Sequence, residues 1–125
     1  MEDQELIELA RKAREFSYSP YSNFKVGAAL ITHEGKVYSG CNIENASFGI
    51  TNCAERTAIF KAVSEGAREI DTIAIIADSD GPCSPCGACR QAMAEFKVKR
   101  VIMANLKGEV KAVSLAELLP YSFAL

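Results

Sequence analysis

The chain has 125 residues, of which 49% are hydrophobic, and this length and composition predict a single domain, residues 1–125, with one sizeable core. Its net charge of -2 and its scattered 14 Lys and Arg residues leave no basic strip for a phosphate backbone, so we expect no nucleic-acid partner. No apolar run approaches the ~18 residues of a bilayer-spanning helix, and the acidic N-terminus does not resemble a signal peptide, so we expect no membrane partner and a cytoplasmic protein.

The first half of the sequence predicts a helix, a hairpin and a second helix. Residues 3–16 carry apolar side chains at helical spacing, and a serine-rich turn segment follows them. Residues 24–31 and 36–43 are rich in β-branched and aromatic side chains and flank Gly35, which predicts a hairpin. Residues 53–66 are helix formers that end at a glycine typical of helix C-caps.

The second half predicts alternating strands and helices. Residues 70–77 form a continuous apolar run of the kind that is buried on both faces of a sheet, and a loop rich in Gly and Pro follows. A helix, a strand, a second strand after a glycine turn and a short last helix are predicted at 88–96, 98–105, 106–113 and 114–120. This order predicts an α/β fold, a three-layer α/β/α sandwich around a mixed five-stranded sheet.

The chain has five cysteines, at positions 41, 53, 83, 86 and 89. An odd count without a secretion signal argues against a disulfide framework, which leaves thiols available for a metal. Cys86 and Cys89 lie three residues apart at a predicted helix start and can hold one ion. This pair alone is also compatible with a dithiol redox site, half of a zinc ribbon or chance. Cys83 precedes the pair at the same spacing, and spacing alone does not decide which two thiols bind metal.

A second motif, Cys53-Ala54-Glu55, opens another predicted helix about thirty residues upstream of the segment 85–89. Together the two motifs match the arrangement of zinc deaminases in an all-cysteine form. The segments SYSPYSNFKVGAAL, GCNIEN, CAERTAIFKAVSEG and SPCGACRQ, in this order, resemble the small, all-cysteine, homotetrameric cytidine deaminases. The resemblance covers residues 15–120.

The resemblance implies a cytidine deaminase-like fold and one Zn²⁺ per chain, with Cys53, Cys86 and Cys89 as ligands and Glu55 as proton shuttle. It implies a hydrolase of pyrimidine salvage that converts cytidine, and 2′-deoxycytidine, to the uridine counterpart plus ammonia. Three thiolates leave the fourth tetrahedral position of zinc open for a water that the metal makes acidic, which is the pattern of a catalytic site. We expect Glu55 to carry a proton from this water to ring N3 and then to protonate the departing ammonia.

Zinc with three thiolates carries a formal charge of about -1, which two helix N-termini can offset in part. Arg56 adds a full positive charge three residues after Cys53, on the same helix face, where its guanidinium can donate to sulfur and weaken the sulfur's donation to zinc. We expect Gln91, close after Cys89, to hold Arg56 in place.

Asn42 and Glu44 project from the same side of an extended segment, which fits a pair of hydroxyl-binding groups and equally a solvated strand end. The resemblance assigns both to the ribose 3′-hydroxyl region. Phe24 is a core residue on general grounds, whereas the resemblance places it against the pyrimidine face. The resemblance adds Ala54 as a substrate contact and places a further group near a subunit boundary: Tyr21, Ala46, Ser47, Phe48 and Phe123.

The C-terminal segment LLPYSFAL is unusually apolar for a chain end, and such a tail normally packs against something. Together with the resemblance, this tail predicts a homotetramer whose pockets are shared between subunits. Phe48 stands where many relatives carry Tyr, so a contact by that hydroxyl is absent here. We interpret Cys83 as a spare thiol near the site, Cys41 as a small buried hydrophobe and His33 as a solvent-exposed turn residue.

Alternative functions remain open at this point. They are a related zinc deaminase acting on another aminated base or a nucleoside antibiotic, a zinc-stabilised interaction module, and a dithiol redox protein. The missing basic strip argues against a polymer substrate, and the Asn-Ile-Glu segment favours a ribose over an antibiotic side chain. A redox role leaves the segment 53–56 unexplained. The sequence does not rank cytidine against 2′-deoxycytidine.

Overall fold

A computed structural model describes all residues from Met1 to Leu125, and its helices and strands follow the predicted order. The elements are α1 (Asp3–Arg14), β1 (Val26–Thr32), β2 (Val37–Cys41), α2 (Ala54–Ser64), β3 (Ile70–Ala77), α3 (Gly87–Glu95), β4 (Arg100–Asn105), β5 (Val110–Ser114) and α4 (Leu115–Leu118). One turn of 3₁₀ helix, η1 (Phe48–Ile50), was not predicted and lies between β2 and α2.

The five strands form one sheet in the order β2-β1-β3-β4-β5. All neighbours are antiparallel except β3 and β4, which run parallel, so the predicted mixed sheet is confirmed. β3 lies in the middle, and seven of its eight residues are buried, as its continuous apolar run indicated. The parallel connection from β3 to β4 passes through α3, which places the start of α3 beyond the carboxyl end of the central strand.

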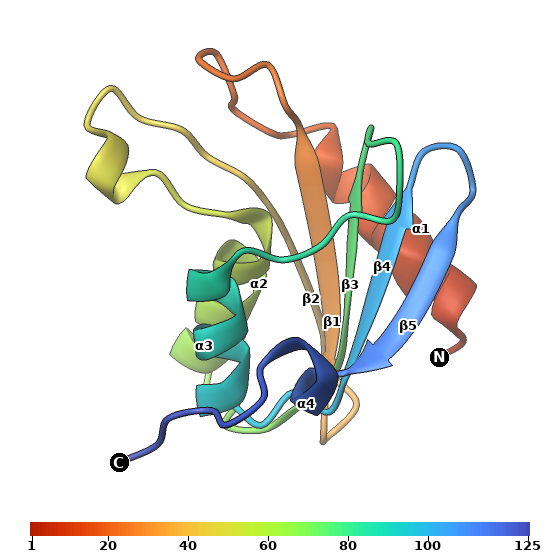
Figure 1. The fold of residues 1–125 in the computed structure, drawn as a ribbon, viewed down its shortest axis with the longest axis vertical. Coiled ribbons are helices and arrows are strands. Elements are labelled where there is room, and N and C mark those ends of the chain that lie inside the picture. Colours follow the sequence, from red (N-terminus) through yellow and green to blue (C-terminus); the bar gives the residue numbers. More distant parts are fainter.

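Helices cover both faces of the sheet (Figure 1), which confirms the three layers. α1 packs on one face over a core of 8 buried residues, and α2 and α3 pack on the other over a core of 15. Two glycines allow the helices to approach closely. A Cβ on Gly27 would lie 1.9 Å from the carbonyl oxygen of Ala10 in α1, and one on Gly40 would lie 2.7 Å from the amide of Ala58 in α2. None of the helices is long and apolar enough to span a bilayer.

The hairpin is shorter than the sequence predicted, and the difference matters for the site. β1 begins at Val26 rather than at residue 24, and β2 ends at Cys41 rather than at residue 43. At this end the side chain of Asn42 interrupts the ladder, because its Oδ1 accepts from the amide of Val26 at 2.9 Å. Phe24 and Asn42 therefore lie in loops beside the hairpin and not within its strands.

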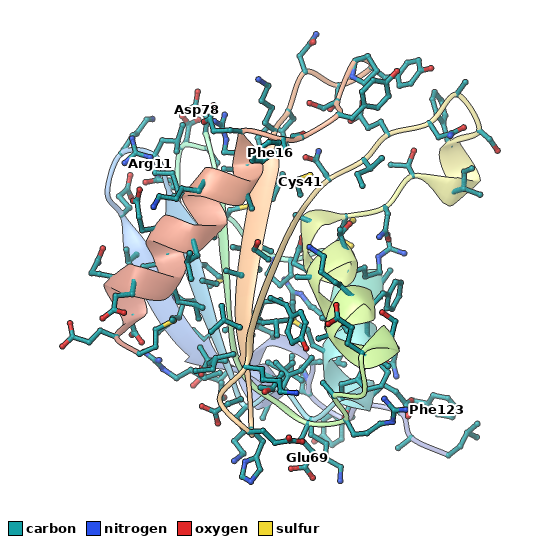
Figure 2. All side chains as sticks on the ribbon, turned by 180° about the vertical axis from the view of Figure 1, so that it is seen from behind. Arg11, Phe16, Cys41, Glu69, Asp78 and Phe123 are labelled. Carbon is teal, nitrogen blue, oxygen red and sulfur yellow. The ribbon has the colours of Figure 1, made fainter.

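Two loops, residues 15–25 and 42–53, extend beyond the same end of the sheet (Figure 1). They are joined by isolated bridges, with Ile43 pairing with Tyr18 in the first loop and with Asn52 in its own. The C-terminal tail lies apart from both loops, and Phe123 projects from it away from the sheet (Figure 2). The loops and the tail together carry most of the large apolar side chains that are exposed in the single chain: Phe16, Tyr18, Tyr21, Phe24, Ile43, Phe48, Ile50, Tyr121, Phe123 and Leu125.

Candidate metal centre and active site

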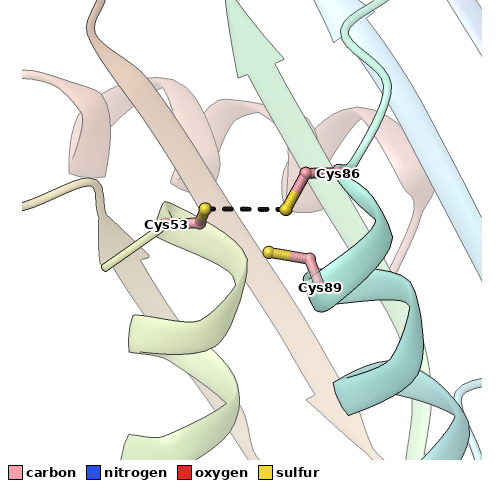
Figure 3. A group of neighbouring side chains, drawn as sticks. All are labelled: Cys53, Cys86 and Cys89. Carbon is pink, nitrogen blue, oxygen red and sulfur yellow. Dashed lines mark hydrogen bonds between the residues drawn. The ribbon is translucent and has the colours of Figure 1, made fainter. Parts of the chain in front are cut away.

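The starts of α2 and α3 carry three cysteines. Cys53 is the N-cap of α2, Cys86 is the N-cap of α3, and Cys89 lies in the first turn of α3. Because α2 and α3 lie on the same face of the sheet, segments more than thirty residues apart meet at their N-terminal ends. All three sulfurs lie within 4.8 Å of one another, and those of Cys53 and Cys86 are 3.8 Å apart (Figure 3).

This spacing fits a single metal ion. Thiolates bound to zinc at ~2.3 Å with tetrahedral angles would lie about 3.8 Å from each other, and a set of soft sulfur ligands suits zinc. The three cysteines differ in burial: Cys89 is buried, Cys53 is half-buried and Cys86 is exposed. Cys83 lies outside the group, and burial raises the pKa of its thiol to about 11. The structure thus brings together the three predicted ligands and leaves out the competing cysteine.

The electrostatics of the group favour a thiolate at Cys53. Hydrogen bonds from Cys89 and Arg56 lower the pKa of Cys53 to about 5. The same interaction with Cys53, together with burial, raises the pKa of Cys89. The positive ends of two helices also face this region, and they stabilise negative charge on sulfur. The group is therefore built to carry negative charge, and a bound cation completes its balance.

Arg56 donates from Nη2 to the sulfur of Cys53 at 3.3 Å, as predicted. The predicted support from Gln91 is not formed in this structure. The side-chain amide of Gln91 donates instead to the carbonyl of Phe123 at 3.2 Å, and the Nε of Arg56 is buried without a partner. Gln91 follows Cys89 by two residues, and residues two apart lie on different sides of a helix, so Gln91 faces the C-terminal tail.

Glu55 lies in the first turn of α2 and is 4% exposed. Burial raises the pKa of its carboxyl to about 7, and the nearby Cys53 thiolate contributes in the same direction. A carboxyl with such a pKa can both accept and donate a proton near neutral pH. Glu55 and two of the three grouped cysteines, Cys53 and Cys86, line a common cavity.

The cavity has a volume of about 300 Å³, and none of its lining residues is Lys, Arg or His. Four predicted substrate contacts lie on its wall: Phe24, Asn42, Glu44 and Ala54. Phe24 is 42% exposed, so its general interpretation as a core residue is wrong. The remaining lining residues were not predicted as site residues, and they are Ser22, Val26, Thr51, Asn52, Cys83 and Ser84. Thr51 and Asn52 directly precede the Cys-Ala-Glu motif, and that adjacency is the signal that could have identified them.

Asn42 and Glu44 are held by hydrogen bonds from the 17–26 segment. Asn42 accepts from the hydroxyl of Ser17 as well as from Val26, and its Nδ2 donates to the carbonyl of Phe24 at 2.7 Å. This arrangement leaves one Nδ2 hydrogen of Asn42 unused.

The carboxylate of Glu44 accepts from the Ser22 hydroxyl and from the amides of Tyr21 and Ser22, at 2.9 and 3.1 Å. These bonds, that of the Ser22 hydroxyl first, lower the pKa of Glu44. Sequence reasoning treated the serines only as turn formers and missed both contacts.

The residues predicted near a subunit boundary do not reach this cavity in the single chain. Tyr21 packs edge to face against Phe48, with 5.8 Å between ring centres, and both line an adjacent hollow of about 200 Å³. The others, Ala46, Ser47 and Phe123, are exposed and line neither space. His33 is exposed as predicted, whereas Cys41 is only partly buried.

The chain has relatives of known sequence and structure. Residues 1–105 match the family model described as "Cytidine and deoxycytidylate deaminase zinc-binding region". A cytidine deaminase of Halalkalibacterium halodurans is 54% identical over 98% of this chain and 95% of its own length. A crystal structure of cytidine deaminase from Burkholderia pseudomallei has a TM-score of 0.95 and 51% identity, covering 98% of this chain and 100% of that one. A blasticidin-S deaminase of Bacillus cereus is more distant, at 30% identity over 98% of this chain and 92% of its own length.

Proposed function

The chain belongs to the family of deaminases that share the cytidine and deoxycytidylate deaminase zinc-binding region, and on this premise we propose that it deaminates cytidine and 2′-deoxycytidine hydrolytically. One observation carries the proposal: the buried carboxyl of Glu55 lies beside a group of three cysteine sulfurs on the wall of a cavity. The products are uridine or 2′-deoxyuridine and ammonia. This reaction belongs to pyrimidine salvage. In this proposal residues 1–125 act as one zinc-dependent domain.

One Zn²⁺ per chain is held by Cys53, Cys86 and Cys89. Zinc held there would supply an acidified water. Glu55 would accept a proton from that water and deliver it to ring N3, and would then accept a second proton from the hydroxyl added at C4 and deliver it to the departing amine. Arg56, which donates to the Cys53 sulfur, offsets part of the negative charge of three thiolates.

The cavity wall favours a nucleoside over a nucleotide. No cationic side chain lines the cavity, so a 5′-phosphate would meet no counter-charge there, and the carboxylate of Glu44 would repel it. Phe24 offers an aromatic face for the pyrimidine ring. Asn42 offers one free N–H and Glu44 offers carboxylate oxygens to the sugar hydroxyls. Within a family named for both cytidine and deoxycytidylate, these residues support the nucleoside.

The isolated chain leaves the rim of the site open, and this supports a homotetramer with shared pockets. Phe48, which lines the hollow beside the cavity, and Phe123, in the C-terminal tail, are 72% and 67% exposed, and exposed aromatic side chains are typical of subunit interfaces. In the assembly we expect Tyr21, Ala46, Ser47 and Phe123 to complete a pocket. A monomeric mass in solution at full specific activity would contradict this assignment.

The proposed function is tested by mixing the purified protein with cytidine and following the loss of the cytosine absorbance band. We expect rapid loss with cytidine and 2′-deoxycytidine, little change with cytidine 5′-monophosphate, and none after incubation with a zinc chelator. An unchanged band with both nucleosides would refute the proposal. A nucleoside-antibiotic deaminase would instead consume blasticidin S and spare cytidine.

A further inference from the structure

Arg90 follows Cys89 on α3 and holds the peptide groups on both sides of Cys86. Its backbone N–H donates to the carbonyl of Cys86 at 3.0 Å, which is the first hydrogen bond of the helix. Its side-chain Nε donates to the carbonyl of Pro85 at 2.9 Å. One residue thus fixes the two carbonyls that flank the Cα of Cys86. No other residue in the chain bonds the Pro85 carbonyl.

The segment before Cys86 has few other restraints. The amide of Cys83 donates to the carbonyl of Ala104 at 3.1 Å, and this is the last backbone hydrogen bond between the loop and the sheet before α3. Pro85 has no N–H to donate, and it is less than 2% exposed. Without the Arg90 side chain, the carbonyl of this buried residue would lose its partner, and an unpaired buried carbonyl is destabilising. The direction of the exposed Cys86 side chain therefore depends on Arg90.

The guanidinium of Arg90 also reaches the C-terminal part of the chain. Its Nη1 donates to the carbonyl of Leu118 at 2.8 Å, at the end of α4. The next residue, Gln91, donates to the carbonyl of Phe123. Two successive residues of α3 therefore hold the C-terminal segment at two points, and Arg90 braces the start of α3 against α4.

We propose that Arg90 is a positioning residue for the metal centre, which holds the Cys86 sulfur in the direction that zinc requires. The proposal rests on the proposed function in one respect, since it takes Cys86 as a zinc ligand. Residues that orient metal ligands typically change metal affinity by 10–100-fold when they are replaced. The consequence is retention of the metal, which can be measured without an activity assay.

The test compares the rate of zinc release to an excess of a chromophoric chelator. We expect Arg90→Gln to release zinc about 10-fold faster than the wild type. Arg68 provides a matched control, because its Nη1 also donates to two carbonyls, those of Val63 and Ala67, at the opposite end of α2. Arg68→Gln should release zinc at the wild-type rate.

Arg90→Lys keeps the charge and can reach only one of the two side-chain acceptors, so its release rate should lie between those of the wild type and Arg90→Gln. Zinc release from Arg90→Gln at the rate of the wild type and of Arg68→Gln would overturn the proposal and leave Arg90 with a structural role alone. Should Arg90→Gln not fold, Arg90→Lys decides: faster release than wild type supports the proposal, and equal release overturns it. A wild-type protein without zinc would refute the proposed function itself.

Discussion

The site has two parts that are built differently. The metal centre consists of the three grouped cysteines and Glu55, at the starts of α2 and α3, and the outer rim consists of side chains from the loops 15–25 and 42–53. Cys53 and Cys86 cap helices that pack on the larger core, and Ala58 of α2 and Met93 of α3 are fully buried there. Tyr21, in contrast, lies in a loop and is 53% exposed, although it belongs to the predicted substrate pocket. The comparison indicates that packed helices set the geometry of the cysteine group, whereas the rim of the cavity depends on loops.

The largest expected effect on turnover comes from a change at the metal centre, at the buried Glu55. Glu55→Gln keeps the shape of the side chain and removes its proton-carrying role, so kcat should fall by about 10³-fold with zinc content unchanged. The measurement is turnover of cytidine together with metal analysis of the same sample. Turnover near the wild-type rate in a zinc-loaded variant would show that the reaction does not need Glu55 as a proton carrier.

The second effect separates two cysteines of the same segment. Cys86→Ser should lose most of its zinc, because it removes one of three sulfurs that lie within 4.8 Å of one another. Cys83→Ser should retain one zinc per chain, since Cys83 lies outside this group and burial keeps it a neutral thiol. Metal analysis of both purified variants measures the difference. Loss of zinc from Cys83→Ser would contradict the ligand assignment.

The third effect belongs to the rim. Glu44→Ala removes the carboxylate that faces the cavity and releases the loop that carries Ser22, so KM for cytidine should rise about tenfold or more. KM for free cytosine, which has no ribose, should change far less. Steady-state kinetics with both substrates measure the ratio. Equal changes in the two KM values would remove Glu44 from ribose recognition.

The smallest expected effect is on folding stability. It comes from an ion pair that belongs to neither part of the site, and it serves as a baseline for the other variants. Arg100 donates to Asp3 through two hydrogen bonds and holds the pKa of that carboxyl below its usual range. A lowered pKa stabilises the fold above the pKa of the unfolded state, and this stability is lost as the pH falls through the folded-state pKa. Because the side chains of Arg100 and Asp3 are 42% and 45% exposed, solvent screens the pair, and Asp3→Asn should cost about 0.5 kcal/mol at pH 7.

Urea unfolding of Asp3→Asn and the wild type at pH 7 and at pH 3 measures this baseline. The difference in the free energy of unfolding between the two proteins should be smaller at pH 3 than at pH 7. The rate of deamination at neutral pH should be the same for both. A constant difference at both pH values would show that the ion pair does not account for it.

The same contrast separates what the sequence could predict from what it could not. The strands and helices follow from apolar periodicity. Spacing placed cysteines at two helix starts, but the choice of Cys86 and Cys89 over Cys83 came from the resemblance to a known family. The partner of Gln91 could not be predicted, because it depends on the path of the C-terminal tail. The bonds from Ser17 and Ser22 to Asn42 and Glu44 depend on two loops meeting, which no local pattern encodes.

The central claim is a zinc ion held by three sulfurs from two helix starts, with its fourth position open beside Glu55. X-ray absorption at the zinc edge of the purified protein tests it most directly. We predict three sulfur neighbours at ~2.3 Å and one oxygen neighbour at ~2.0 Å. Four sulfur neighbours would contradict the account, because a zinc ion closed by Cys83 has no position left for a reacting water.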